Sequence, residues 1–73
     1  MNGRKLYRKR IGNIILDIRR KLDLTQTELA DLYNLKDDGM FTNQRNISKY
    51  EKGVVACPAE VLMKILSFSE EWA

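Results

Sequence analysis

Two short segments, residues 25–30 and 43–53, most restrict the folds that this chain can adopt. Each starts with helix-capping residues and continues with an amphipathic pattern. In the first segment, Thr25 and Glu28 have the spacing of a capping box, in which each side chain accepts a hydrogen bond from the other residue's backbone N–H. In the second, Asn43 is a favourable N-cap, and the terminal glycine suits the left-handed conformation that ends many helices. The sequence therefore predicts two short helices in these segments.

Apolar residues recur every three to four positions along the rest of the chain, which is typical of helices that bury one face. The first helix is expected to start within residues 4–11 and to end near Leu22. Residues 57–60 predict the start of a fourth helix with Pro58 in its first position, where the missing N–H costs nothing. Residues 67–72 permit one more helical turn, so we expect an all-α fold of four to five helices. The residues expected to face inward are Tyr7, Ile11, Ile14 or Ile15, Ile18, Leu22, Leu29, Leu32, Tyr33, Ile47, Tyr50, Val61, Leu62, Ile65, Leu66, Phe68 and Trp72.

The length of 73 residues fits one domain, with a modest core and little room for a substrate-enclosing cavity. We expect residues 1–10 to form a basic N-terminal arm and the start of the first helix, and residues 11–73 to form the folded domain. The chain has no histidine, the usual general base and the commonest metal ligand. Its single cysteine, Cys57, cannot form a zinc site alone and is expected to be a small apolar residue at a helix entrance. We therefore expect no catalytic residue, no cofactor and no metal.

Apolar runs in the chain are short. None approaches the ~18 residues that a membrane span needs. The segment Ile14–Leu16 is too short for the core of a signal peptide, and Asp17 interrupts it. With one cysteine and no export signal, we expect a cytoplasmic chain that does not bind a membrane.

The net charge of +3 conceals an asymmetry along the chain. Residues 1–22 carry eight basic side chains against one acidic side chain, for +7, and residues 23–73 carry five basic and nine acidic side chains, for −4. A strongly basic segment attracts polyanions, although a merely solvated helix face is the alternative. Because the chain also has the features of a helix-turn-helix, the phosphate-binding interpretation is favoured. We expect Arg8, Lys9 and Arg10 to contact phosphates.

The third expected helix, about residues 43–52, presents polar side chains opposite Ile47. Among them, Gln44, Arg45 and Lys49 can hydrogen-bond base edges, since glutamine can pair with adenine and arginine with guanine. Two short helices, the second of which carries such side chains, are typical of a helix-turn-helix that reads the major groove of DNA. The alternative is that these three side chains form an ordinary solvent-exposed face.

Five motifs follow one another along the chain: Gly12-x-x-Ile15-x-x-Ile18-Arg19, Leu24-Thr25-Gln26-x-Glu28-Leu29-Ala30, Ile47-Ser48-x-x-Glu51-x-Gly53, Pro58, and Leu62-x-x-Ile65. In this order and spacing, over roughly residues 11–68, they resemble the Cro/phage-repressor helix-turn-helix family. The resemblance implies a compact lambda-repressor-like domain that reads bases with the third helix. It implies base contacts by Gln44, Arg45 and Lys49, phosphate contacts by Gln26, Asn43, Ser48 and Lys52, and a partly buried ion pair between Arg19 and Glu51.

The link between the second and third helices is longer than in phage repressors. Sixteen residues separate Ala30 from Ile47, and this lengthened link resembles that of the POU-specific domain. We expect the second helix to run to Lys36 and the following residues, Asp37-Asp38-Gly39, to turn the chain, with both aspartates directed away from DNA. Met40 and Phe41 are expected to hold the link against the core.

The resemblance implies a sequence-specific regulator of transcription that binds double-stranded DNA, of the repressor type and of bacterial or phage origin, associated with the nucleoid. Family members commonly bind inverted half-sites as homodimers, and the sequence leaves the oligomeric state, the operator and the regulated genes open. No small-molecule ligand is evident. The alternative is an antitoxin or another protein-binding module on the same scaffold. Such a module would be expected to have an apolar recognition face or an acidic first helix, and this sequence has neither. An antitoxin that also binds DNA would show the same sequence features as the regulator, so that alternative stays open.

Overall fold

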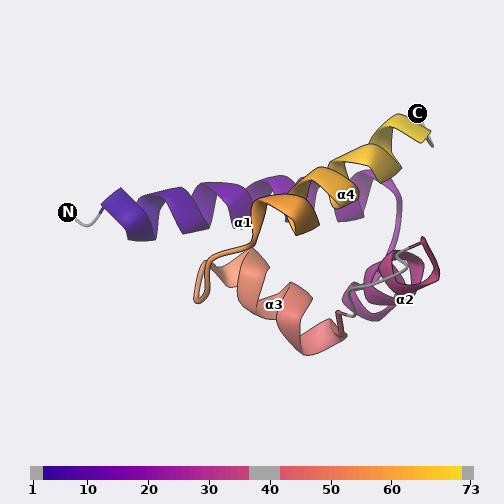
Figure 1. Ribbon diagram of the computed structural model, residues 1–73, viewed down its shortest axis with the longest axis horizontal. Coiled ribbons are helices and arrows are strands. Elements are labelled where there is room, and N and C mark those ends of the chain that lie inside the picture. Colours follow the sequence, from indigo (N-terminus) through magenta and orange to yellow (C-terminus); the bar gives the residue numbers. More distant parts are fainter. Residues whose placement is uncertain (1–2, 37–41, 72–73) are drawn as a thin grey trace.

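The computed structural model describes residues 3–36 and 42–71, which form four α-helices and contain no strand. This confirms the all-α fold class. The extra turn expected at residues 67–72 continues the fourth helix through Glu71, so it is not a fifth helix. Our expectations for the arm at Met1 and Asn2, for the link at residues 37–41 and for Trp72 lie outside the described residues. The helices are α1 (Gly3–Lys21), α2 (Gln26–Lys36), α3 (Gln44–Lys52) and α4 (Ala59–Glu71) (Figure 1).

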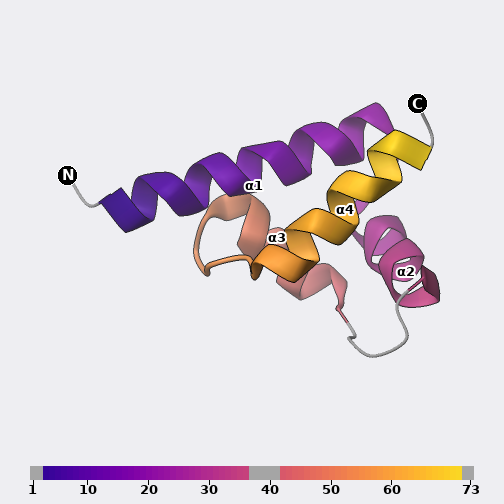
Figure 2. The same cartoon turned by 45° about the horizontal axis from the view of Figure 1, so that its top comes forward.

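The long helix α1 begins at Gly3, one residue before the expected window of residues 4–11. Its N-terminal part extends past the other helices (Figures 1 and 2). The expectation that Tyr7 faces inward is wrong, because this residue is 63% exposed. Of the two candidate isoleucines farther along, Ile15 is fully buried and Ile14 is exposed. None of the described helices combines the length and apolar character needed to cross a membrane.

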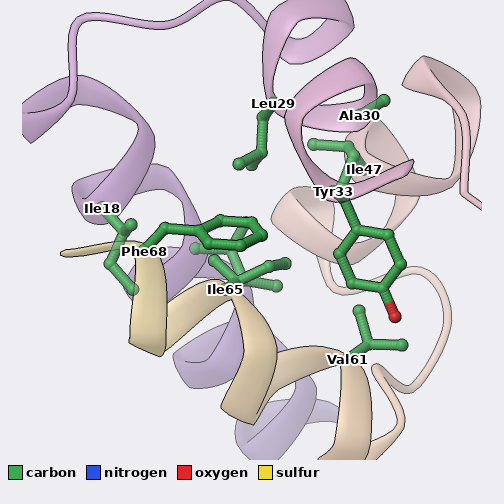
Figure 3. Close-up of a cluster of buried hydrophobic side chains, with 9 residues drawn as sticks. Ile18, Leu29, Ala30, Tyr33, Ile47, Val61, Ile65 and Phe68 are labelled. Carbon is green, nitrogen blue, oxygen red and sulfur yellow. The ribbon is translucent and has the colours of Figure 1, made fainter. Parts of the chain in front are cut away.

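The core lies between the four helices, each of which contributes buried side chains (Figure 3). Tyr33 and Phe68 meet edge to face with ring centroids 6.5 Å apart, a favourable arrangement for aromatic pairs. In α4 the buried stripe is narrower than expected, because Leu62 is half-buried and Leu66 is 39% exposed. The buried residues are Ile15, Ile18, Leu29, Ala30, Tyr33, Ile47, Val61, Ile65 and Phe68.

Local hydrogen bonds set the helix ends. The capping box is confirmed, since Glu28 N–H donates to Thr25 Oγ1 at 3.1 Å and Thr25 N–H donates to Glu28 Oε1 at 2.8 Å. Hydrogen bonding to Thr25, first to its backbone N–H and second to its side chain, lowers the pKa of the Glu28 carboxyl group. Asn43 caps α3 by accepting from Asn46 N–H at 2.9 Å. The expected place of Pro58 is off by one: it precedes the first residue of α4, and its carbonyl accepts the first helical bond, from Leu62 N–H.

Two glycines allow α1 and α3 to cross closely. Gly12 is buried, and a Cβ built on it would meet the backbone carbonyl oxygens of Tyr50 and Glu51. Gly53 ends α3 in the left-handed conformation at φ 72°, and a Cβ on it would lie 3.1 Å from the Cα of Lys9. The C-terminal half of α3 is therefore fixed against the middle of α1, which leaves the first turn of α3 at the far end from this crossing.

Candidate nucleic-acid interface

The outer face of α3 is polar. Ile47 is completely buried, whereas Gln44, Arg45 and Lys49 are exposed. All three side chains lie in the first two turns of α3. Their exposure agrees with the sequence analysis, and base reading by them stays a prediction.

The expected ion pair between α1 and α3 is present. Arg19 Nε donates to Glu51 Oε2 at 2.7 Å, and Arg19 Nη2 donates to Glu51 Oε1 at 3.1 Å. A third bond, from Arg19 Nη1 to the Leu24 carbonyl oxygen at 3.0 Å, connects the same guanidinium to the turn before α2. The side chains are only 19% and 6% exposed. Hydrogen bonding to Glu51 raises the pKa of Arg19, with burial acting in the opposite direction.

A chain of side-chain hydrogen bonds continues from this ion pair to the exposed surface. Gln26 Nε2 donates to Glu51 Oε1 at 3.0 Å, and Gln44 Nε2 donates to Gln26 Oε1 at 2.6 Å. A carboxylate can only accept hydrogen bonds, so Gln26 must direct its NH₂ group to Glu51 and its carbonyl oxygen to Gln44. Gln44 must then direct its NH₂ group to Gln26. The buried carboxylate thus sets the orientation of an exposed amide on α3.

Three more residues expected to contact phosphate, Asn43, Ser48 and Lys52, lie at the start of α3 or within it. Asn43 is exposed, but its side-chain oxygen is engaged in the cap, which leaves its amide nitrogen as a donor for a ligand. Ser48 is half-buried, and Lys52 is exposed at the C-terminal end of the helix. Together with Gln26 these groups follow α3 along its length.

Two basic residues of α1, Arg8 and Lys9, lie at the opposite end of α3 from Gln44. A Cβ built on Gly53 would lie 3.1 Å from the backbone of Lys9 and 3.4 Å from that of Arg8, so both residues adjoin the C-terminus of α3. Lys9 and Arg10 are exposed. Arg8 is half-buried, and its Nε is enclosed without a hydrogen-bond partner among the described residues. The structure thus places the Gln26–Gln44 pair at one end of α3 and the basic segment of α1 at the other.

Cys57 lies before α4, as expected for a small residue at a helix entrance. It is half-buried, and its Sγ donates to the Pro58 carbonyl oxygen at 3.5 Å. Burial disfavours the thiolate and raises the pKa of Cys57 to about 11, which keeps the thiol neutral at physiological pH. Over residues 3–36 and 42–71, no cluster of histidine, cysteine or acidic side chains is arranged to hold a metal ion.

Two hydrogen-bonded contacts in this region are not predicted from the sequence. One is the Gln26–Gln44 bond, and the other joins Asn34 of α2 to the backbone of Thr42, just before α3. Their partners are 18 and 8 residues apart, so no helical spacing relates them.

No protein-family model, curated protein or solved structure matches the chain. Its function is therefore inferred from the residues around α3.

Proposed function

We propose that this chain is a sequence-specific binder of double-stranded DNA with a lambda-repressor-like helix-turn-helix, and that it regulates transcription as a repressor. In this proposal α3 lies in the major groove. The observation that carries it is Gln44: an exposed amide in the first turn of a polar helix, held at 2.6 Å by the amide of Gln26. Water can satisfy the amide of an ordinary solvent-facing glutamine, whereas a base-reading glutamine gains a fixed side-chain orientation from such a bond.

The held amide of Gln44 suits adenine. Its Nε2 uses one N–H for Gln26 and keeps the second, while its Oε1 stays available as an acceptor. Adenine presents the complementary pair in the major groove, with N7 as acceptor and N6–H as donor. Because Gln26 already restrains the side chain, less conformational entropy is lost on binding. Arg45 supplies the matching donors for guanine, and Lys49 reaches a base edge one turn farther along.

Phosphate contacts would come from both ends of the same surface. The N-terminus of α2 carries Gln26, and free backbone N–H groups at helix N-termini favour anions. Asn43, Ser48 and Lys52 follow α3, and the basic segment of α1 adjoins its C-terminus. Contacts of this kind set position and supply affinity, while the first turn of α3 supplies base preference.

Selection of bound sequences from a random duplex library tests the proposal. We expect one enriched motif that contains an adenine and a guanine at neighbouring positions, for Gln44 and Arg45. The spacing of repeated half-sites, where present, would report whether two copies bind together. Failure to enrich any sequence would contradict the proposal and favour the alternative of a protein-binding module.

Arg45→Ala should weaken binding to the selected site by ~1–3 kcal/mol and relax the preference at one base pair, because a bidentate contact is lost. The measurement is a comparison of the sequence motifs selected by the variant and the wild type. Arg20→Ala removes an equally exposed arginine from the far end of α1 and serves as the control. Identical motifs for Arg45→Ala and wild type would remove Arg45 from the base-reading residues.

The triple variant Arg8→Ala, Lys9→Ala, Arg10→Ala should weaken specific and non-specific binding about equally. Log affinity falls as log salt concentration rises, and each lost phosphate contact makes this negative slope less steep by roughly 0.9. Titrations at several salt concentrations measure this slope. Arg20→Ala with Lys21→Ala removes two exposed basic residues at the other end of α1 and should leave the slope almost unchanged. If the triple variant also kept the wild-type slope, its three residues would be a solvated face.

A further inference from the structure

The residue that leads into α3, Thr42, is bonded to α2 through the side-chain amide of Asn34. Asn34 Nδ2 donates to the Thr42 carbonyl oxygen at 2.8 Å, and Asn34 Oδ1 accepts from the Thr42 N–H at 2.8 Å. Thr42 is buried, with 7% of its surface exposed, and Asn34 is half-buried. One amide thereby satisfies both backbone groups of a buried residue, which would be costly to leave unpaired.

This pair connects the core to the first turn of α3. Asn34 directly follows Tyr33, which is 1% exposed and fixed in the core. Thr42 directly precedes Asn43, whose side chain caps α3. The position of the cap, and of Gln44 immediately after it, is therefore defined by Asn34 through a continuous series of short contacts.

The C-terminal half of α3 has its own fixed point, where Gly12 lets α1 cross closely. A helix of nine residues is about 13 Å long, so a small rotation about that crossing would move its first turn by ångströms. Base pairing by a side chain tolerates far less than that. The first turn therefore needs a second fixed point, and the bonds of Asn34 to the backbone of Thr42 provide one beside the Gln26–Gln44 side-chain bond.

We propose that Asn34 is a positioning residue for base reading: by holding both backbone groups of Thr42, it fixes the height and direction at which the first turn of α3 enters the groove. This inference rests on the DNA-binding function proposed above. Asn34 itself does not contact DNA in this arrangement. It acts through Thr42 and Asn43 on the two side chains that follow them, Gln44 and Arg45.

Two variants test this role. Asn34→Ala removes both hydrogen bonds. Asn34→Asp keeps the size of the side chain and one acceptor but places a second carboxylate oxygen against the Thr42 carbonyl, so it remains informative if the alanine variant folds poorly. Affinities for the selected site and for a random duplex are measured at a temperature where circular dichroism shows each variant folded. Asn13→Ala, which removes an exposed asparagine from α1, is the matched control.

Affinity for the selected site should fall about tenfold to thirtyfold in both variants, because Asn34→Ala loses two hydrogen bonds, and Asn34→Asp loses one and places a carboxylate oxygen against the Thr42 carbonyl oxygen. Affinity for the random duplex should stay near the wild-type value, because binding without base preference depends mainly on charge attraction to phosphates and little on the direction of the first turn of α3. In the free protein, the Thr42 and Asn46 amides should exchange with solvent at least several times faster, whereas loss of stability alone would accelerate exchange throughout the core.

An unchanged ratio of specific to non-specific affinity in both Asn34 variants would overturn the inference and leave the DNA-binding proposal intact. Equal losses on both duplexes would also overturn it, because they would indicate a general defect. A wild-type protein without any sequence preference would instead overturn the proposed function, and the inference with it.

Discussion

Replacing Gly12 with alanine should destabilise the folded chain by about 3 kcal/mol, the upper range for adding a methyl group to a filled site. The added Cβ would meet the carbonyl oxygen of Tyr50 and lie 2.6 Å from that of Glu51. Both are backbone atoms, which cannot swing aside as the end of a side chain can. The only relief is separation of α1 from α3, which removes buried contacts of Ile15 and Ile47.

A loss of stability would be informative, because alanine is intrinsically favoured over glycine within a helix by about 1 kcal/mol. Without a clash, Gly12→Ala would therefore be expected to increase stability. Chemical denaturation of the variant and the wild type measures it. Gly3→Ala is the matched control, because nothing lies within 4 Å of a Cβ at Gly3. That variant should be as stable as the wild type or slightly more so. Unchanged or increased stability of Gly12→Ala would show that α1 and α3 do not cross as closely as described.

Helix boundaries are the part of the fold that the sequence predicts best. The signals that set them act over three or four residues, as in the Thr25–Glu28 box and the Asn43 cap, so they can be read without knowledge of distant contacts. Gly53 is similar, since its positive φ is a local requirement at a helix end.

Burial is predicted less well, because periodicity identifies a face and not its neighbours. Tyr7 fits the apolar spacing of α1, but it is 63% exposed. Leu66 directly follows the buried Ile65 in α4, and it is 39% exposed. How far each neighbouring helix reaches depends on crossing geometry, which residue spacing does not encode.

The candidate site divides in a similar way. Arg19 and Glu51 are 32 residues apart, yet the family resemblance pairs them, and a charge beside an apolar stripe requires a partner. The amides of Gln26, Asn34 and Gln44 carry no such requirement, since water can satisfy them wherever they are exposed. Their pairings with each other and with Thr42 become visible only once α2 and α3 are placed side by side.

Glu51→Ala should lower the free energy of unfolding by about 3 kcal/mol, as expected when one partner of a largely buried ion pair is removed. Arg19 would keep its charge with only 19% of its side chain exposed, and Gln26 would lose its acceptor. Chemical denaturation measures the loss. Glu60→Ala removes an exposed glutamate from the first turn of α4 and should change stability much less.

The double variant Arg19→Met, Glu51→Leu should recover part of this stability, because a matched apolar pair leaves no unpartnered charge. Denaturation of Arg19→Met, of Glu51→Leu and of the double variant gives the coupling energy between the two side chains. A coupling near zero would mean that the two side chains do not act on each other.

Recovered stability should not bring back base preference. Without the Glu51 carboxylate, nothing holds the NH₂ group of Gln26 on the side away from Gln44, so the Gln26 amide can take either orientation. The Gln44 amide then loses its fixed orientation as well. The double variant is therefore expected to fold and to bind duplexes, but with a weakened preference at the base pair that Gln44 reads. Sequence selection with this variant measures that preference. A fully retained adenine preference would show that Gln44 is oriented by the DNA alone and that the ion pair serves only the fold.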